Sequence, residues 1–318
     1  NEKIRAAIEN AKELEQYWET EEKHMDKDII WMTWHAINYL NDLGKHFEAQ
    51  ELVEKLTGCL GLCGFGPNVA IYPDNIIYKT VKLEDVPEIV REHFYKGRPV
   101  KRLMIDDGDH VQEEIYDVNK TRFYAKQKRV ALKDCGVIDP ENIEEYIAKD
   151  GYVALGRALT EMTPAQVIEE ITKSGLRGRG GGGFLTGRKW QFAAAEKDPE
   201  KYVICNADEG DPGAFMDRSI LEGNPLAVIE GMMIAGYAIG AQNGYFYVRA
   251  EYPIAVERLR NAIKQARELG LLGKNILGTG FNFDVHIRLG AGAFVCGEET
   301  ALLNSIEGKR GMPRPRPP

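Results

Sequence analysis

Hydrophobic and polar positions divide the chain into three zones of different spacing. In residues 1–58 the apolar side chains recur every three or four positions and glycine is almost absent, a pattern that predicts helices. The zone at 59–105 contains two short β-branched and aromatic runs, 69–72 and 76–78, and the turn-forming segment between them predicts a hairpin. A helix is expected to follow from Asp85 to Tyr95.

The third zone, from about residue 160 onward, alternates helix-length stretches with short apolar runs. The expected helices lie near 164–175, 188–195, 226–241, 254–269 and 298–306, and the expected strands at 202–205, 245–249 and 284–289. Strands separated by helices are typical of a parallel α/β sheet, in which ligands bind in loops beyond the strand ends. We therefore predict four regions: 1–58 (helical), 59–105 (a small domain), 106–150 (connecting) and 151–318 (the α/β domain).

The composition narrows the class of protein. With 318 residues, of which 43% are hydrophobic and 28% charged, the chain is long and apolar enough to bury a core. The 41 Lys and Arg against 49 Asp and Glu leave a net charge of −8, so no basic field is available to bind nucleic acid. The most apolar stretch, 226–241, carries Glu230 and is too short to span a bilayer, so we expect a buried helix and no membrane insertion.

The cysteine count and the chain ends carry two further expectations. Five cysteines, with no signal-peptide pattern, predict a reducing, cytoplasmic location. The first residue, Asn1, and the terminal proline run lead us to expect that both ends are trimmed.

The strongest chemical signal is the loop at 175–187, in which seven of thirteen residues are glycine. Glycine amides in such a turn form an anion-binding nest, and Arg179, Lys189 and the start of the next helix add positive charge, so a phosphate is expected there. The segment Gly178–Gly183 also fits the GxGxxG pattern, but a dinucleotide fingerprint should follow a strand and here follows a helix. The alternative, a flexible linker, is disfavoured by the interleaved Arg, Phe, Lys and Trp residues.

Two further segments carry candidate chemistry. The run 205–213 places polar and acidic side chains directly after a strand, where they suit a heterocycle or ribose; an acidic turn or a metal-binding loop explains this segment equally well. The run 290–300 is a glycine turn in which Glu298 and Glu299 stand at a helix start, a favourable place for negative charge whatever else they do.

Taken together, the segments 175–190, 206–213 and 290–318 closely resemble the FMN- and NADH-binding flavoprotein subunit of NADH:quinone oxidoreductase. The same subunit recurs in NAD-dependent hydrogenases and formate dehydrogenases, and the segment 307–318 looks most like those members. The resemblance extends from about residue 59 to 318. It implies an α/β fold with a Rossmann-like parallel-sheet domain for FMN and NAD, preceded by a partial thioredoxin-like 2Fe-2S domain.

The resemblance also implies a site built from several loops. Contacts to FMN are expected from Gly178, Arg179, Gly180, Gly181, Gly183 and Lys189, from Asn206, Asp208, Glu209 and Gly210, and from Phe294, Gly297 and Glu298. Contacts to NAD(H) are expected from Phe184, Phe192, Asp211 and Glu299, and Arg316, where many family members have lysine, is expected to bind a cofactor. Hydride transfer needs mainly closeness and orientation of the two rings, so no side chain is expected to be catalytic.

The cysteines fit the family only in part. Cys59 and Cys63 match the second cysteine pair of the family's 2Fe-2S domain, whereas residues 1–58 contain no cysteine for the first pair. A complete cluster needs four ligands, so either a further segment supplies them or the site is degenerate and the domain is a scaffold. Three histidines could be imagined as ligands but stand alone on expected helices, namely His24, His35 and His46.

The family's 4Fe-4S region is expected only beyond Pro318, and Cys135 and Cys296 are not expected to replace it. The predicted function is an FMN-dependent NADH dehydrogenase module of the diaphorase type, which passes single electrons to the iron–sulfur and catalytic subunits of a larger redox complex. Two alternatives stand beside it: a non-catalytic structural subunit that keeps the fold, and a flavin-free Rossmann NAD dehydrogenase.

Overall fold

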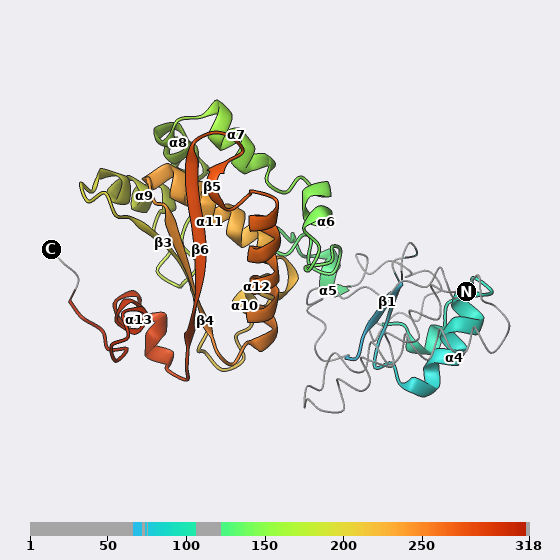
Figure 1. Ribbon diagram of the computed structural model, residues 1–318. Helices are drawn as coiled ribbons and strands as arrows, with labels where there is room; N and C mark the ends of the chain where they lie inside the picture. The colour runs from blue at the N-terminus through green and yellow to red at the C-terminus, as the bar shows by residue number, and fades with distance from the viewer. Residues whose placement is uncertain (1–65, 72–73, 75, 106–121, 316–318) are drawn as a thin grey trace. The chain divides into compact units, whose positions relative to one another are not determined.

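The computed structural model describes residues 66–315 apart from 72–73, 75 and 106–121 (Figure 1). The expectations for 1–58, for Cys59 and Cys63, and for Arg316 lie outside the described residues. The chain divides into two compact units, and among the described residues the first ends at Arg129 and the second begins at Val130.

The first unit contains a small antiparallel hairpin. Strands β1 (Val69–Ile71) and β2 (Ile76–Tyr78) pair with Val69 opposite Tyr78, as the sequence predicts. The expected helix is present as three consecutive turns of different pitch, η2 (Leu83–Asp85), α4 (Val86–Glu88) and the π-helical η3 (Ile89–Phe94). Two short helical segments complete the unit, η4 (Lys101–Leu103) and α5 (Arg122–Ala125).

A series of hydrogen bonds between polar groups runs through the core of the first unit. The hydroxyl of Tyr78 lies 2.6 Å from Nδ1 of the buried His93 and accepts a hydrogen bond from the amide of Val100 at 2.9 Å. Nε2 of His93 lies 3.0 Å from Oδ2 of Asp74. These bonds join the hairpin to the helical segment, so the buried polar groups are satisfied.

The second unit is built on a four-stranded sheet in the order β3-β4-β6-β5. Strands β3 (Tyr202–Ala207), β4 (Asn243–Arg249) and β6 (Phe281–Gly290) are parallel, which confirms the predicted parallel α/β arrangement for this part of the chain. Strand β5 (Gly273–Ile276) adds an antiparallel edge that the sequence analysis does not predict.

Helices of the second unit connect and cover the strands. They are α6 (Ile143–Ala148), α7 (Val153–Glu161), α8 (Pro164–Ser174), α9 (Thr186–Ala195), α10 (Met216–Gly223), α11 (Pro225–Ile239), α12 (Pro253–Glu268), the short η6 (Phe294–Gly297) and α13 (Glu299–Ile306). The sequence analysis does not predict α7 and α10. Helix α8 begins at a capping box, in which the side chains of Thr163 and Gln166 each bond the other residue's backbone amide.

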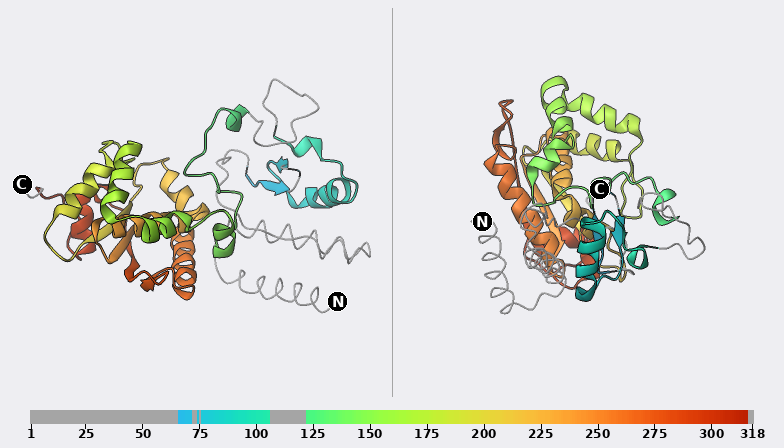
Figure 2. Two further views of the ribbon diagram at one scale, coloured as in Figure 1. Left: turned by 90° about the horizontal axis from the view of Figure 1, so that it is seen from above. Right: turned by 90° about the vertical axis from the view of Figure 1, so that its right-hand side faces the viewer.

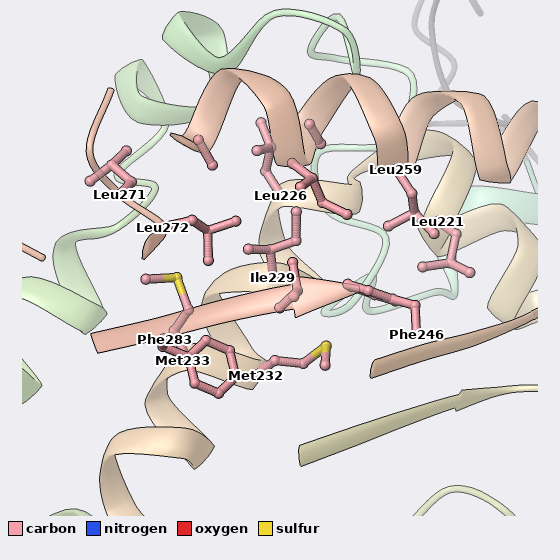
Figure 3. Packing of buried hydrophobic residues seen from close by; sticks show 14 of the residues in the cluster. Leu221, Leu226, Ile229, Met232, Met233, Phe246, Leu259, Leu271, Leu272 and Phe283 are labelled. Carbon is pink, nitrogen blue, oxygen red and sulfur yellow. The ribbon is translucent and has the colours of Figure 1, made fainter. Parts of the chain in front are cut away.

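The two faces of the sheet carry different cores because successive strand residues point to opposite sides. On one face, Phe246 and Phe283 pack with α10, α11 and α12 in the large cluster that Figure 3 shows. On the other face, Tyr247 packs with Cys296 and Leu302 beside α13. The sheet is therefore held between layers of helices, with η6 and α13 on the face away from α11.

Glu230, the one charged residue of the apolar helix α11, is buried, and both of its carboxylate oxygens accept hydrogen bonds. Its carboxylate accepts hydrogen bonds from the hydroxyl of Tyr146 at 2.5 Å and from the amides of Tyr152 at 2.9 Å and Leu155 at 3.0 Å. Helices α6 and α7 are thereby fixed to α11, so helix α6, which lies in the predicted connecting region 106–150, packs into the core of the second unit.

The predicted buried character of α11 is confirmed. Of the helices within the described parts of the chain, none has both the length and the apolar composition needed to cross a membrane.

Candidate functional site

The glycine loop joins α8 to α9 and is closed at its base like a small hairpin. The amide of Gly178 donates to the carbonyl of Phe184 at 2.8 Å, and the amide of Thr186 donates to the carbonyl of Leu176 at 2.9 Å. Gly181 and Gly183 take positive φ angles of 94° and 59°, which side-chain-bearing residues rarely adopt. The loop therefore follows a helix and leads into another, as the sequence order predicts.

The tip of the glycine loop faces open space. A Cβ atom added at any of the four consecutive glycines would meet no other heavy atom within 4 Å; these are Gly180, Gly181, Gly182 and Gly183. Arg177, which the sequence analysis does not single out, steadies the tip by donating from Nη1 to the carbonyl of Gly183 at 3.0 Å. The loop therefore has a fixed base and a backbone that a ligand can approach closely.

The second candidate loop leaves the carboxyl end of β3. The side chain of Asn206 accepts from the amide of Asp208 at 3.2 Å and donates to the carbonyl of Gly297 at 2.8 Å. Glu209 turns the other way, and its carboxylate accepts from the amides of Asp217 at 3.0 Å and Arg218 at 3.1 Å, at the start of α10. The Glu209 carboxylate thus caps a helix, while its backbone remains in the loop.

One carboxylate oxygen of Asp208, Oδ2, is buried and accepts no hydrogen bond from the described residues. Burial raises the pKa of this carboxyl group, and the nearby Arg249 guanidinium partly offsets that rise. A buried acceptor that stays unsatisfied costs free energy, so Asp208 is prepared to receive an N–H or O–H donor from a ligand.

The third candidate loop follows β6. Gly210 of the second loop approaches Phe294 so closely that an added Cβ would lie 3.1 Å from the Phe294 Cα, so a side chain at this position would push Phe294 aside. Glu298 accepts from the amides of Thr300 and Ala301, both at 2.9 Å, and so caps α13. The expected role of Glu298 at a helix start is confirmed.

The three sequence motifs converge at one end of the sheet. Helices α9 and α13 lie on the same side of the second unit in Figures 1 and 2, and Nζ of Lys189 lies 4.0 Å from the carboxylate of Glu299. The bond between Asn206 and Gly297 joins the other two loops. Motifs that are far apart in the sequence therefore meet beyond the carboxyl ends of the parallel strands, where α/β proteins bind ligands.

Large aromatic side chains stand open to solvent around these loops. Phe184, Phe192 and Phe294 are 51%, 55% and 69% exposed, and the Arg188 guanidinium lies 5.4 Å from the centre of the Phe192 ring. The charged Arg179 and Asp211 are also exposed. Apolar side chains left open to this degree indicate a surface that a flat ligand or another protein covers.

Within residues 66–315, as far as they are described, no group of three or more His, Cys, Asp or Glu side chains is placed to hold a metal ion. Cys135 and Cys296 are buried, and Cys296 packs with Tyr247 and Leu302.

Comparison with known proteins shows which family the site resembles. Residues 171–318 match the family model described as the Nuo51 FMN-binding domain. The chain is 60% identical over 193 residues to the HndC component of the NADP-reducing hydrogenase of Solidesulfovibrio fructosivorans, covering 61% of this chain and 39% of that protein. It is 54% identical over 177 residues to an NADH-quinone oxidoreductase subunit of Aquifex aeolicus, covering 56% of this chain and 41% of that protein.

A solved structure supports the same relationship. The fold is similar to the crystal structure of an NAD+-reducing NiFe hydrogenase in the H2-reduced state, with a TM-score of 0.50, 30% identity, and coverage of 82% of this chain and 40% of that chain. The chain thus spans well under two thirds of the length of the relatives that it matches. The resemblance to the flavoprotein subunit of NADH:quinone oxidoreductase is confirmed: residues 171–318 match the Nuo51 FMN-binding domain, and the relatives that the chain resembles are subunits of a hydrogenase and of an NADH-quinone oxidoreductase.

Proposed function

We propose that this chain is the FMN- and NAD(H)-binding module of a multi-subunit redox enzyme, in which electrons pass between a nicotinamide nucleotide and iron–sulfur partners. The observation that carries the proposal is the buried Oδ2 atom of Asp208, which has no hydrogen-bond partner among the described residues. Asp208 lies in the loop after β3, which Asn206 bonds to the loop at Gly297, and both loops fall within the residues that match the Nuo51 FMN-binding domain. A donor on a bound heterocycle would satisfy that atom. When bound, FMN would supply the exchange between a two-electron hydride and single electrons.

The residues present fit a flavin mononucleotide. The open glycine tip offers backbone amides to a phosphate, and Lys189 and Arg179 add positive charge. On the proposed assignment, the ring system and ribityl chain lie against the second and third loops, held by Asn206, Asp208, Glu209, Gly210, Phe294, Gly297 and Glu298. For Glu209 the backbone is the contact we propose, because its carboxylate already caps α10.

The exposed aromatic side chains support a second, flat ligand beside the flavin. We assign Phe184 and Phe192 to stacking with the nicotinamide nucleotide, and Asp211 and Glu299 to its ribose hydroxyls. Arg316 is assigned to cofactor binding from the sequence alone. The role of these residues is to bind and orient the two rings, so none of them is proposed as an acid or base.

The wider setting is proposed from the relatives. The names of the two curated relatives, which are subunits of an NADP-reducing hydrogenase and an NADH-quinone oxidoreductase, support a place in a multi-subunit redox enzyme. The partners that we propose there carry iron–sulfur clusters and a second catalytic centre. We further propose that 59–105 is a thioredoxin-like domain, that 151–318 is the flavin domain joined to it through 106–150, and that the protein works in the cytoplasm. Cys59 and Cys63 would then contribute two ligands to a 2Fe-2S cluster completed by other residues.

The visible spectrum of the purified protein tests the proposal. After reconstitution with FMN and removal of free ligand, we expect a flavin absorption band and one FMN released per chain on denaturation. A protein that binds NADH but no flavin would favour the Rossmann dehydrogenase alternative, and a protein that binds neither would favour the structural subunit. Quenching of FMN fluorescence on titration gives the dissociation constant that the experiments below use.

A further inference from the structure

We propose that Arg249 and Glu251 are positioning residues that clamp the two flavin-facing loops, 206–213 and 290–297, in the spacing that ligand binding requires. The inference rests on the proposed function and goes beyond it, because neither residue belongs to the three sequence motifs. Both lie at the end of β4, the strand between β3 and β6, from whose ends the two loops leave.

Arg249 reaches the first loop. It is the last residue of β4 and is largely buried, with its side chain 21% exposed. Its Nη1 donates to the backbone carbonyl of Glu209 at 2.8 Å, next to the peptide of Gly210, which in turn approaches Phe294. A charged donor makes a stronger hydrogen bond than a neutral one, so the guanidinium is well suited to fix that carbonyl.

Glu251 reaches the second loop. Its Oε1 accepts the amide of Gly292 at 3.0 Å and the Nη2 of Arg249 at 3.3 Å. Gly292 has a φ of 63°, so the loop turns sharply at the atom that Glu251 holds. The backbone amide of Glu251 itself, the nearby guanidinium and the amide of Gly292 together hold the pKa of the Glu251 carboxyl below its usual range, so the carboxylate stays charged at neutral pH.

Tyr252 completes the arrangement. Its ring lies under two guanidinium groups, with its centre 5.5 Å from Arg249 and 5.7 Å from Arg218. Its hydroxyl lies 3.2 Å from the carbonyl and 3.3 Å from the carboxylate of Glu209, either of which can accept its proton. The Glu209 peptide is therefore held from two directions, and its carbonyl is fixed relative to the end of β4.

The clamp also reaches Asp208 electrostatically. Burial raises the pKa of Asp208, the positive charge of Arg249 lowers it, and the negative charge of Glu251 raises it further. Removing the guanidinium would therefore both release the Glu209 carbonyl and make the partnerless Asp208 carboxylate harder to ionise. Both changes act on the flavin-facing loops rather than on the large hydrophobic core.

The test measures the FMN dissociation constant of Arg249→Met, Glu251→Met and the double variant, each in the full chain, together with the melting temperature of the FMN-free protein. We expect each single variant to weaken FMN binding about tenfold or more, because a charge-assisted hydrogen bond is lost in each. The double variant should lose less than the product of the two single effects, because both act through one connected pair. Glu251→Gln, which keeps the acceptor for the Gly292 amide, should restore most of the affinity.

A matched control separates positioning from general stability. Arg267 makes a two-bond ion pair with Asp284 at 3.0 and 3.1 Å, on the same sheet but in none of the flavin-facing loops. Arg267→Met is expected to lower the melting temperature without changing the FMN dissociation constant. If Arg249→Met does not fold, Arg249→Lys replaces it, since lysine keeps the charge but cannot reach both partners.

Two results would count against different statements. If the wild-type chain binds no FMN, the proposed function fails. If the wild-type chain binds FMN and the clamp variants bind it equally well while melting at lower temperature, the proposed function survives and the clamp is overturned as a purely structural contact.

Discussion

The side-chain amide of Asn206 donates to the backbone carbonyl of Gly297 at 2.8 Å, across 91 positions of sequence. The same side chain accepts the amide of Asp208, so one residue connects the end of β3 with η6 and orders the loop between β3 and α10. The two loops that carry the proposed flavin contacts are therefore joined by a bond that does not involve the flavin.

Replacing Asn206 with alanine should weaken both FMN binding and the fold. Each lost hydrogen bond is worth about 1 kcal/mol, so we expect the free energy of unfolding to fall by about 1–2 kcal/mol and the FMN dissociation constant to rise about tenfold. Asn282→Ala is the control, since Asn282 accepts the amide of Asn275 in the β5–β6 turn. An unchanged dissociation constant in Asn206→Ala would contradict the prediction.

The buried carboxylate of Asp208 should lower the stability of the FMN-free protein and strengthen FMN binding. Because burial raises its pKa above the usual 3.8, the folded chain holds the proton more tightly than the unfolded chain does. The cost of ionising Asp208 is absent below the usual pKa, grows as the pH rises from there to the raised pKa of the folded chain, and is constant above it. Asp208→Asn should therefore raise the melting temperature of the FMN-free protein at pH 7 and leave it unchanged at low pH.

The same variant should gain less stability from added FMN than the wild type does, because the charged acceptor is lost. Thermal melts at several pH values, with and without FMN, measure both effects. The exposed Asp198→Asn serves as the control. A lower melting temperature for Asp208→Asn at pH 7 without FMN would show that the buried carboxylate already has a partner.

Glu230 should be among the most sensitive positions for stability. Glu230→Leu would leave the Tyr146 hydroxyl and the amides of Tyr152 and Leu155 without their acceptor in the core. We expect a loss of about 3 kcal/mol or more in the free energy of unfolding by urea, and a smaller loss for Glu230→Gln. The exposed Glu257→Ala, on α12, should change it by less than about 0.5 kcal/mol.

The sequence predicts those parts of the fold whose apolar spacing is regular. Strands β3, β4 and β6 and helix α11 are short or long apolar runs, and helix α8 begins at a capping box, so local chemistry is sufficient for them. Strand β5 has the sequence Gly-Lys-Asn-Ile, without a strand pattern, and exists because it pairs with the exposed edge of β6. Helix α10 is capped by Glu209 from outside its own sequence, which a search for local capping residues does not find.

In the candidate site, too, some features follow from the local sequence and others from tertiary contacts. The three motifs are visible because glycine and acidic residues cluster in the sequence, but their junctions depend on tertiary contacts such as that between Lys189 and Glu299. Arg249 and Glu251 stand alone in the sequence and become meaningful only when β4 is placed between β3 and β6. A charged residue at the carboxyl end of a predicted central strand is the signal that could have indicated Arg249.

Gly180→Val should separate ligand binding from folding. An added Cβ at Gly180 meets no heavy atom within 4 Å, and Gly180 is not among the glycines with positive φ, so the variant should keep the melting temperature of the FMN-free protein. Its side chain would occupy the space through which a phosphate approaches the backbone, so FMN retention should be lost. Gly187→Ala is the contrasting variant, because its Cβ would lie 2.7 Å from the Thr172 Cα and should disturb the packing of α8 on α9. Undiminished FMN content in Gly180→Val would remove the glycine loop from the flavin site.

The preferred nucleotide should be NADH rather than NADPH. Carboxylates at Glu299 and Asp211 suit ribose hydroxyls and repel a 2′-phosphate, although one relative at 60% identity is named for NADP. We expect a higher kcat/KM with NADH in the FMN-loaded complex, measured with an artificial acceptor. Glu299→Gln should narrow that difference by about tenfold, because one repulsive charge is removed beside Lys189, whose Nζ lies 4.0 Å from the Glu299 carboxylate. Glu307→Gln, in the segment after α13, should leave the ratio unchanged, and a wild-type preference for NADPH would reject the assignment of both acidic residues.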